Sequence, residues 1–211
     1  EFSRSMVWPR VGEAYLDLGA RVMSEVPIRL APIKPECASS LPELRLDHLV
    51  RMTDDTGVIQ HATFSVPARS TGYCVDDNAR ALIVALQADR ISSDSQTKRL
   101  VTTYLSYLHC AQTAMGDFKN LMSYDRTLGS GPGSEDCLGR AIWALGSTVE
   151  LAADEGCSRL AKDMFNRALP RAMDLGPRGT ALSILGLVSV IAVEPSDAGA
   201  RNSMSVMAEK L

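Results

Sequence analysis

The second half of the chain alternates between two kinds of helical segment, and this alternation constrains the fold more than any other feature. Three segments with helical periodicity are apolar on almost every side: residues 78–91, 137–153 and 180–193. Three more carry one apolar stripe opposite a polar face: residues 96–115, 158–173 and 197–209. A helix that is apolar all round is buried on several sides, whereas a one-stripe helix covers the outside of a core. The order therefore predicts three hairpins, each with an inner and an outer helix.

Stacked hairpins of this kind build an all-α fold, either an α/α solenoid or an α/α toroid. No segment predicts a regular strand, and the one β-like run, residues 62–66, lies inside a long polar connection over residues 53–74. A connection of that length without clear periodicity is usually functional or poorly ordered. A short helix over residues 44–52 precedes it.

The first 42 residues have a different character from the rest. Residues 11–25 predict a helix, and the segment 27–42 then holds four prolines, so that it cannot be helical. We expect two parts: residues 1–42, an N-terminal helix and proline-rich linker that form the tail of a preceding domain, and residues 43–211, the helical domain. The pairs Glu1-Phe2 and Lys210-Leu211 are translations of common restriction sites, so we expect cloning scars at both ends.

Composition excludes several classes of protein. The longest apolar stretch, residues 181–193, is too short to span a bilayer, which needs roughly 18–20 residues. A net charge of -3 gives no basic footprint for nucleic acid. The five cysteines are odd in number and irregularly spaced, so we expect reduced, mostly buried thiols, a cytoplasmic location and no zinc site. Motifs for nucleotides, zinc proteases and serine hydrolases are absent from the sequence, and no metal or other cofactor is expected.

Acidic residues gather where two of the apolar helices begin. Asp76-Asp77-Asn78 precedes Arg80, and Ser134-Glu135-Asp136 precedes Arg140, so each helix has an acid four residues before an Arg-Ala step. One interpretation is structural: an acid or serine caps the helix, and acid–arginine pairs form across one turn. The other is functional, because so many polar groups at the mouth of a buried helix are costly unless they face a wet cavity. Paired carboxylates across such a cavity are the equipment of glycosidic bond cleavage.

Further candidates lie in the connections between helices. Asp54 belongs to an Asp-Asp-Thr-Gly turn, and His61 is more typical of a surface residue than of a general base. Tyr73 and Tyr124 could stack on sugar faces, although ordinary packing also explains them. The candidate catalytic residues are Asp76, Asp77, Asp54 and Glu135. The candidate substrate-binding residues are His61, Tyr73, Asn78, Arg80, Tyr124, Asp125, Asp136 and Arg140.

Residues 48–62 (HLVRMTDDTGVIQHA) together with residues 72–82 (GYCVDDNARAL) form a long motif. It resembles the C-terminal region of certain bacterial group 1 glycosyltransferases, and residues 136–146 and 7–16 also match segments of that family. The resemblance covers most of residues 7–195. It implies an α/α toroid of the six-hairpin glycosidase type that follows the transferase domains. This sequence lacks the transferase domains and the later hairpins of that family. We therefore expect a partial toroid with an open ring, and we do not expect transferase activity.

Three functions follow as hypotheses. The first is a glycoside hydrolase acting on a glucan- or mannan-type saccharide through paired carboxylates at the inner-helix mouths. The second is a non-catalytic module that binds a saccharide or a partner beside a glycosyltransferase. The third is a partial domain without activity of its own. An open ring would expose apolar inner-helix surface and favour self-association.

Overall fold

The computed structural model describes residues 8–25, 43–131 and 133–211. The chain divides into two compact units, residues 1–43 and residues 44–211, each described by itself. In the first unit the structure describes one helix, α1 (Trp8–Glu25). The prolines of the expected linker fall outside the described residues, so the expected division into a tail and a helical domain stays a prediction.

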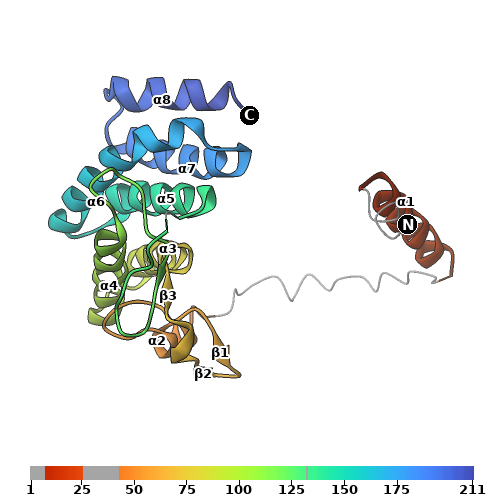
Figure 1. Ribbon diagram of the computed structural model, residues 1–211, viewed down its shortest axis with the longest axis horizontal. Coiled ribbons are helices and arrows are strands. Elements are labelled where there is room, and N and C mark those ends of the chain that lie inside the picture. The colour runs from red at the N-terminus through yellow and green to blue at the C-terminus, as the bar shows by residue number, and fades with distance from the viewer. Residues whose placement is uncertain (1–7, 26–42, 132) are drawn as a thin grey trace. The chain divides into compact units, whose positions relative to one another are not determined.

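The second unit is built from three helical hairpins, as the alternation predicts. Its inner helices are α3 (Val75–Ile91), α5 (Glu135–Leu151) and α7 (Pro177–Val193). The outer helices are α4 (Ser95–Ala111), α6 (Glu155–Ala168) and α8 (Ala198–Ala208). Figure 1 shows α3, α5 and α7 following one another through the stack, with α4 and α6 side by side against them. The fold class is therefore all-α, with stacked hairpins.

The remaining elements are short. α2 (Asp47–Met52) precedes the first hairpin, and 3-10 turns cover Arg69–Thr71 (η3) and Leu169–Asp174 (η4). Contrary to the sequence reading, four two-residue strands form: β1 (Ala62–Thr63) pairs with β2 (Val66–Pro67), and β3 (Tyr73–Cys74) pairs with β4 (Leu121–Met122). Strands of two residues are too short to show the alternation by which strands are recognised. The connection over residues 53–74 is consequently ordered by backbone pairing.

Each outer helix begins with an aspartate that caps it. The carboxylates of Asp94, Asp154 and Asp197 accept hydrogen bonds from backbone N–H groups one turn on, at 2.7–2.9 Å. At α4 the cap is reciprocal, because the Thr97 hydroxyl accepts a bond from the backbone N–H of Asp94. These caps fix where each hairpin turns from its inner to its outer helix.

Glycines bring α5 and α7 into close contact. Gly139 faces Gly179, and Gly146 faces Gly186. The second pair lies seven residues after the first on both helices. A Cβ atom on Gly139 would lie 2.7 Å from the Gly179 carbonyl oxygen, and one on Gly146 would overlap the Gly186 carbonyl. The matching offsets show that α5 and α7 run parallel, so their N-termini lie at the same end of the stack.

The core lies between the inner and outer helices, where Leu82, Tyr104, Leu145 and Phe165 are almost fully buried. The segment 180–193 was expected to be buried on several sides, but α7 is buried on one side and leaves Leu185 and Val188 44% and 53% exposed. Its position at the end of the inner row explains this exposure. Among the described residues, no helix is long and apolar enough to cross a membrane.

The described cysteines are all free thiols. Cys74 and Cys137 are buried, Cys157 is half-buried and Cys110 is exposed, so burial is less general than the sequence suggested. Cys37 lies outside the described residues. Burial, together with the hydrogen bond to Asp77, raises the pKa of the Cys74 thiol to about 12. These buried thiols are therefore packing groups and poor nucleophiles.

Candidate functional site

The N-termini of the inner helices carry a chain of opposite charges. Arg140 of α5 stands between two carboxylates: its Nε lies 3.2 Å from Asp76 Oδ1 on α3, and its Nη2 lies 3.8 Å from Asp136 Oδ2 one turn before it. Asp136 continues to Arg178 of α7, whose Nη1 lies 3.0 Å away. We call Asp76, Asp136, Arg140 and Arg178 the rim cluster. It links all three inner helices.

The centre of the rim cluster is shielded from water. The side chains of Asp76 and Arg140 are 24% and 15% exposed. Although Arg140 Nε and Asp76 Oδ1 are in ion-pair range, neither atom has a well-directed hydrogen bond from any described residue. Their attraction is thus electrostatic, and each retains unused hydrogen-bonding capacity. Buried polar atoms with such capacity favour a polar ligand or water.

Asn120, which the sequence reasoning missed, holds Asp76 in place. Its side-chain amide donates to Asp76 Oδ2 at 3.1 Å. Its side-chain and backbone oxygens also accept hydrogen bonds from the Val75 N–H, at 3.1 and 2.9 Å. A loop distant in sequence thus supplies the acceptors for the first N–H group of α3. Asn120 directly precedes β4, an element too short to be read from sequence. Nothing in the pattern around it marks it as a site residue.

Arg178 was also missed, although a signal for it existed. It is the second residue of α7, the third inner helix, and so occupies the same rim as the acids that open α3 and α5. Glu135 supports this junction, because its Oε2 accepts a hydrogen bond of 2.8 Å from the Gly176 N–H, the N-cap of α7. The Glu135 carboxylate therefore joins the start of α5 to the start of α7.

The acids at the start of α3 pair differently from the simple one-turn expectation. Arg80 forms its ion pair with Asp77, and its Nε–H donates a hydrogen bond of 3.2 Å to the backbone oxygen of Asp76. Asp77 also accepts a hydrogen bond of 3.0 Å from the Cys74 thiol. Neither acid is the N-cap, a place that Cys74 occupies. Both lie in the first turn, where negative charge is favoured by the helix dipole.

Three of the candidate residues organise the connection before α3. Asp54 accepts from the backbone N–H of Thr56 at 2.8 Å and from the Tyr73 hydroxyl at 2.6 Å. Tyr73 is buried, which raises the pKa of its hydroxyl. Asn78 is fully buried and clamps the connection, accepting from Val58 N–H at 3.0 Å and donating to the Cys74 carbonyl at 2.9 Å. Asp54, Tyr73 and Asn78 accordingly hold this connection together, and their roles in a site stay predictions.

Tyr124 forms an exposed aromatic surface beside this network. It stacks on Tyr73, with ring centroids 6.2 Å apart, and is 43% exposed. The guanidinium of Arg69 lies 5.8 Å from the Tyr124 ring centroid. Next to it, Arg126 binds both oxygens of Asp55 at 2.8 and 2.9 Å. A half-exposed stacked tyrosine of this kind can receive the apolar face of a ring.

The last two candidates lie away from the rim cluster contacts. Asp125 is exposed and closes a turn by accepting from the Ser123 hydroxyl and the Thr127 N–H; the bond from Ser123 is the main cause of its lowered pKa. His61 is exposed, and its backbone carbonyl accepts from Ala68 at the base of the β1–β2 hairpin. Neither side chain contacts Asp76, Asp136 or Arg140 within the described part of the chain.

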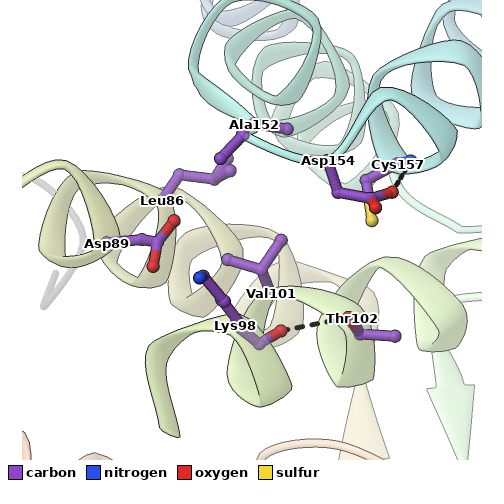
Figure 2. A pocket seen from close by; sticks show the side chains of 9 residues that line it. Leu86, Asp89, Lys98, Val101, Thr102, Ala152, Asp154 and Cys157 are labelled. Carbon is purple, nitrogen blue, oxygen red and sulfur yellow. Dashed lines mark hydrogen bonds between the residues drawn. The ribbon is translucent and has the colours of Figure 1, made fainter. Parts of the chain in front are cut away.

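A cavity lies at the opposite end of the inner helices, near the C-termini of α3 and α5 (Figure 2). Its volume is about 500 Å³. The two carboxylates that line it already have hydrogen-bond partners. Asp89 accepts a hydrogen bond from the Thr97 hydroxyl, and Asp154 accepts one from the Cys157 N–H. Lys98 extends into the space from α4. The cavity shares no residue with the rim cluster.

No group of three or more His, Cys, Asp or Glu side chains lies together within residues 8–25, 43–131 and 133–211 in a way that could hold a metal ion. The rim cluster combines two carboxylates with two guanidinium groups. Such groups form charge-assisted hydrogen bonds.

Comparison with known proteins supports the fold. No protein-family model and no curated protein matches the chain. Among solved structures, cellobiose 2-epimerase from Spirochaeta thermophila DSM 6192 is similar, with a TM-score of 0.67, 17% sequence identity, and coverage of 86% of this chain and 54% of that one. The chain thus spans about half the length of this neighbour. The likeness shows that the stacked hairpins have the α/α-toroid fold.

Proposed function

We propose that residues 44–211 are a carbohydrate-processing domain whose ligand binds at the rim cluster. The observation that carries this proposal is the Asp76–Arg140–Asp136 arrangement at the N-termini of parallel inner helices. Hydrogen-bonding side chains around partly buried charges suit the hydroxyl groups of a sugar. The structural neighbour, by its name, is an enzyme of cellobiose, which is consistent with a saccharide as ligand.

Hydrolysis of a glycosidic bond in a glucan- or mannan-type saccharide is the reaction we assign. It requires two carboxylates flanking the scissile bond, one to protonate the leaving oxygen and one as base or nucleophile. Asp76 and Asp77 are the candidates for these roles, because both lie at the mouth of α3. Asp54 and Glu135 are less suited, since their carboxylates serve the turn at Thr56 and the cap at Gly176. Arg140, Asp136 and Arg178 would orient the sugar.

The test is a screen for released reducing ends over α- and β-linked glucans and mannans. Cellobiose is included with a separate assay for conversion of its reducing-end glucose to mannose. Asp76→Asn and Asp77→Asn should each lower the rate at least about 100-fold, the scale of a lost acid or base. Asp163→Asn, an exposed acid on α6, is the matched control and should leave the rate unchanged. Full activity in both the Asp76 and the Asp77 variants would exclude these two residues from the reaction.

A non-catalytic saccharide-binding module is the second candidate. The observation in its favour is that Asp76, Asp77 and Asp136 are each paired with an arginine. This function predicts that calorimetry detects oligosaccharide binding that Arg140→Ala abolishes, without turnover in the screen. Absence of both binding and turnover would instead favour the third hypothesis, a partial domain without independent activity.

Two further expectations from sequence stay proposals. One is that this domain normally accompanies a bacterial group 1 glycosyltransferase, and the other is that it works in the cytoplasm. Co-purification of a glycosyltransferase with the tagged chain from its native cells would support the first. Cell fractionation with an antibody against the chain tests the second.

A further inference from the structure

The side chain of Asn120 is bound on both of its sides, and this fixes which way its amide points. Its Nδ2 donates to Asp76 Oδ2 at 3.1 Å, and its Oδ1 accepts from the Val75 N–H at 3.1 Å. The two ends of an amide are not equivalent, since the nitrogen donates and the oxygen accepts. Because the Val75 N–H can only donate, the amide oxygen faces it. The amide nitrogen is thereby directed at the Asp76 carboxylate.

Backbone pairing fixes the position of Asn120 itself. Asn120 directly precedes β4, which pairs with β3, and β3 leads directly into α3. The Asn120 carbonyl also accepts from the Val75 N–H at 2.9 Å. A short side chain joins the amide to this anchored backbone. The donor that faces Asp76 therefore has little freedom to move away from it.

Donors face both oxygens of the Asp76 carboxylate. Arg140 Nε lies 3.2 Å from Oδ1, and within the described part of the chain Oδ1 is shielded from water. The Asp76 side chain as a whole is 24% exposed, so a ligand reaches the carboxylate through Oδ2, the oxygen that Asn120 holds. A proton on either oxygen would compete with a donor, so this setting suits the ionised carboxylate.

Asn120 differs from the other polar groups around Asp76, because it adds a donor without adding a charge. The acids Asp77 and Asp136 are each bound by an arginine. Burial, and then the negative charge of Asp76, raise the pKa of the Cys137 thiol, which therefore stays neutral. The ionisable groups that face Asp76 are, on α5, Asp136, Cys137 and Arg140, and, on α3 and its N-cap, Cys74, Asp77 and Arg80.

We propose that Asn120 is the positioning residue of the rim cluster, which holds Asp76 as an ionised carboxylate with Oδ2 available to the ligand. This inference rests on the proposed function, in which Asp76 is one of the two reacting carboxylates. It assigns to Asp76 the part of base or nucleophile, because the other carboxylate must carry the proton for the leaving oxygen. Asn120 acts through Asp76 and takes no part in bond making or breaking.

Asn120→Asp separates positioning from helix capping. It keeps an oxygen acceptor for the Val75 N–H, and negative charge suits the start of a helix. It also replaces the donor to Asp76 with a like charge. On the saccharide found in the screen above, the acidic limb of the kcat/KM profile should move to higher pH by about 1 unit or more. A residue that only caps α3 would leave this limb in place.

Two further variants calibrate that shift. Asn120→Ala removes the donor without adding a charge, so the acidic limb should move in the same direction by a smaller amount. Asn166→Asp adds the same charge on the exposed side of α6 and should leave the profile unchanged. Circular dichroism checks that each variant stays helical. If Asn120→Asp does not fold, the shift in Asn120→Ala decides the outcome.

A titration followed by carbon NMR of the aspartate carboxyl groups tests the same contact without any activity. The Asp76 signal is identified by its loss in Asp76→Asn. In Asn120→Asp the two carboxylates should titrate as a coupled pair, whose upper step lies above the titration of Asp76 in the unsubstituted chain. Unchanged titrations in Asn120→Asp and Asn120→Ala overturn the inference, even in an active enzyme. Shifted titrations in a chain that processes no saccharide uphold the positioning and remove the proposed function.

Discussion

The outer helices and two of the three inner helices, α3 and α7, begin in different ways. Each outer helix is capped from within its own first turn, by Asp94, Asp154 or Asp197. Two inner helices are satisfied from distant parts of the chain: Asn120 accepts from the first N–H of α3, and Glu135 accepts from the N-cap N–H of α7. Local capping makes an outer helix start largely independent of the rest of the fold. Capping from a distance ties the starts of the inner helices to one another.

This difference places the polar chemistry at one end of the stack. The same segments that satisfy the inner helix starts also bring Asp76, Asp136, Arg140 and Arg178 together. Long-range packing therefore builds the rim cluster, and we expect changes to the inner row to affect the whole domain. Changes at the outer caps should stay local.

The largest effect should follow from disturbing the glycine contact between α5 and α7. Gly146→Val places a branched side chain where even a Cβ would overlap the Gly186 carbonyl. Overpacking of this kind should lower the free energy of unfolding by roughly 3 kcal/mol or more, as measured by urea denaturation. Gly131→Ala, where nothing lies within 4 Å of an added Cβ, is the control. Equal stability of the two variants would show that α5 and α7 can separate without cost.

A smaller but still substantial effect is expected at Asn120. Asn120→Ala removes a donor to Asp76 and an acceptor for the Val75 N–H. Leaving such groups without partners should cost about 1–3 kcal/mol in urea denaturation. Asn166→Ala on the exposed side of α6 should change stability by no more than about 0.5 kcal/mol. If the two variants behave alike, the inner helix starts do not depend on distant caps.

An outer cap should matter less than Asn120. Asp197→Ala removes the acceptor for the Ala200 N–H and one partner of Lys162. We expect a loss on the order of 1 kcal/mol in thermal or chemical denaturation, with the signals of the other hairpins unchanged. Asp163→Ala, an acid that caps nothing, controls for the charge. Cooperative unfolding of the whole domain at a much lower temperature would contradict a local role.

The smallest effect concerns pH. Backbone hydrogen bonds from Thr97, Cys157 and Ala200 lower the pKa of Asp94, Asp154 and Asp197 below 3.8. A carboxylate whose pKa is lower in the folded state contributes stability above its unfolded pKa and loses it as the pH falls through its folded pKa. Stability should therefore decline as the pH drops below about 4.

The triple variant with asparagine at these three positions separates charge from capping, because asparagine caps helices about as well as aspartate. It should show a flatter decline of the urea midpoint between about pH 5 and about pH 2. The unsubstituted chain measured in the same buffers is the reference. An identical decline in both would show that the acid sensitivity does not come from these three aspartates.

The helices themselves were largely predictable, with errors at their ends that have local causes. The segment 78–91 starts instead at Val75, because Asp76 and Asp77 occupy the polar first turn and hide it from apolar periodicity. The segment 158–173 ends at Ala168 and continues as the 3-10 turn η4, which contains Pro170 near its start. Proline removes a backbone donor and disfavours continuation of the α-helix.

The candidate site was predictable in part. The repeated acid–arginine spacing correctly indicated that Asp76, Asp136 and Arg140 belong to starts of inner helices. It could not indicate that Arg140 faces Asp76 while Arg80 pairs with Asp77. Partner choice depends on the rotation of α3 relative to α5, which spacing within one helix does not determine.

The sequence alone determined the fold class, the number of hairpins and which helix of each lies in the inner row, because the width of an apolar face follows directly from residue order. The outer caps at Asp94, Asp154 and Asp197 are local contacts too, although the sequence analysis did not predict them. The tertiary structure decided which charges meet at the rim cluster, which candidates hold the connection before α3 together, and that Leu185 and Val188 of α7 are exposed. Those features depend on residues far apart in the chain, such as Asn120 with Val75 and Glu135 with Gly176, brought together only when the inner helices pack.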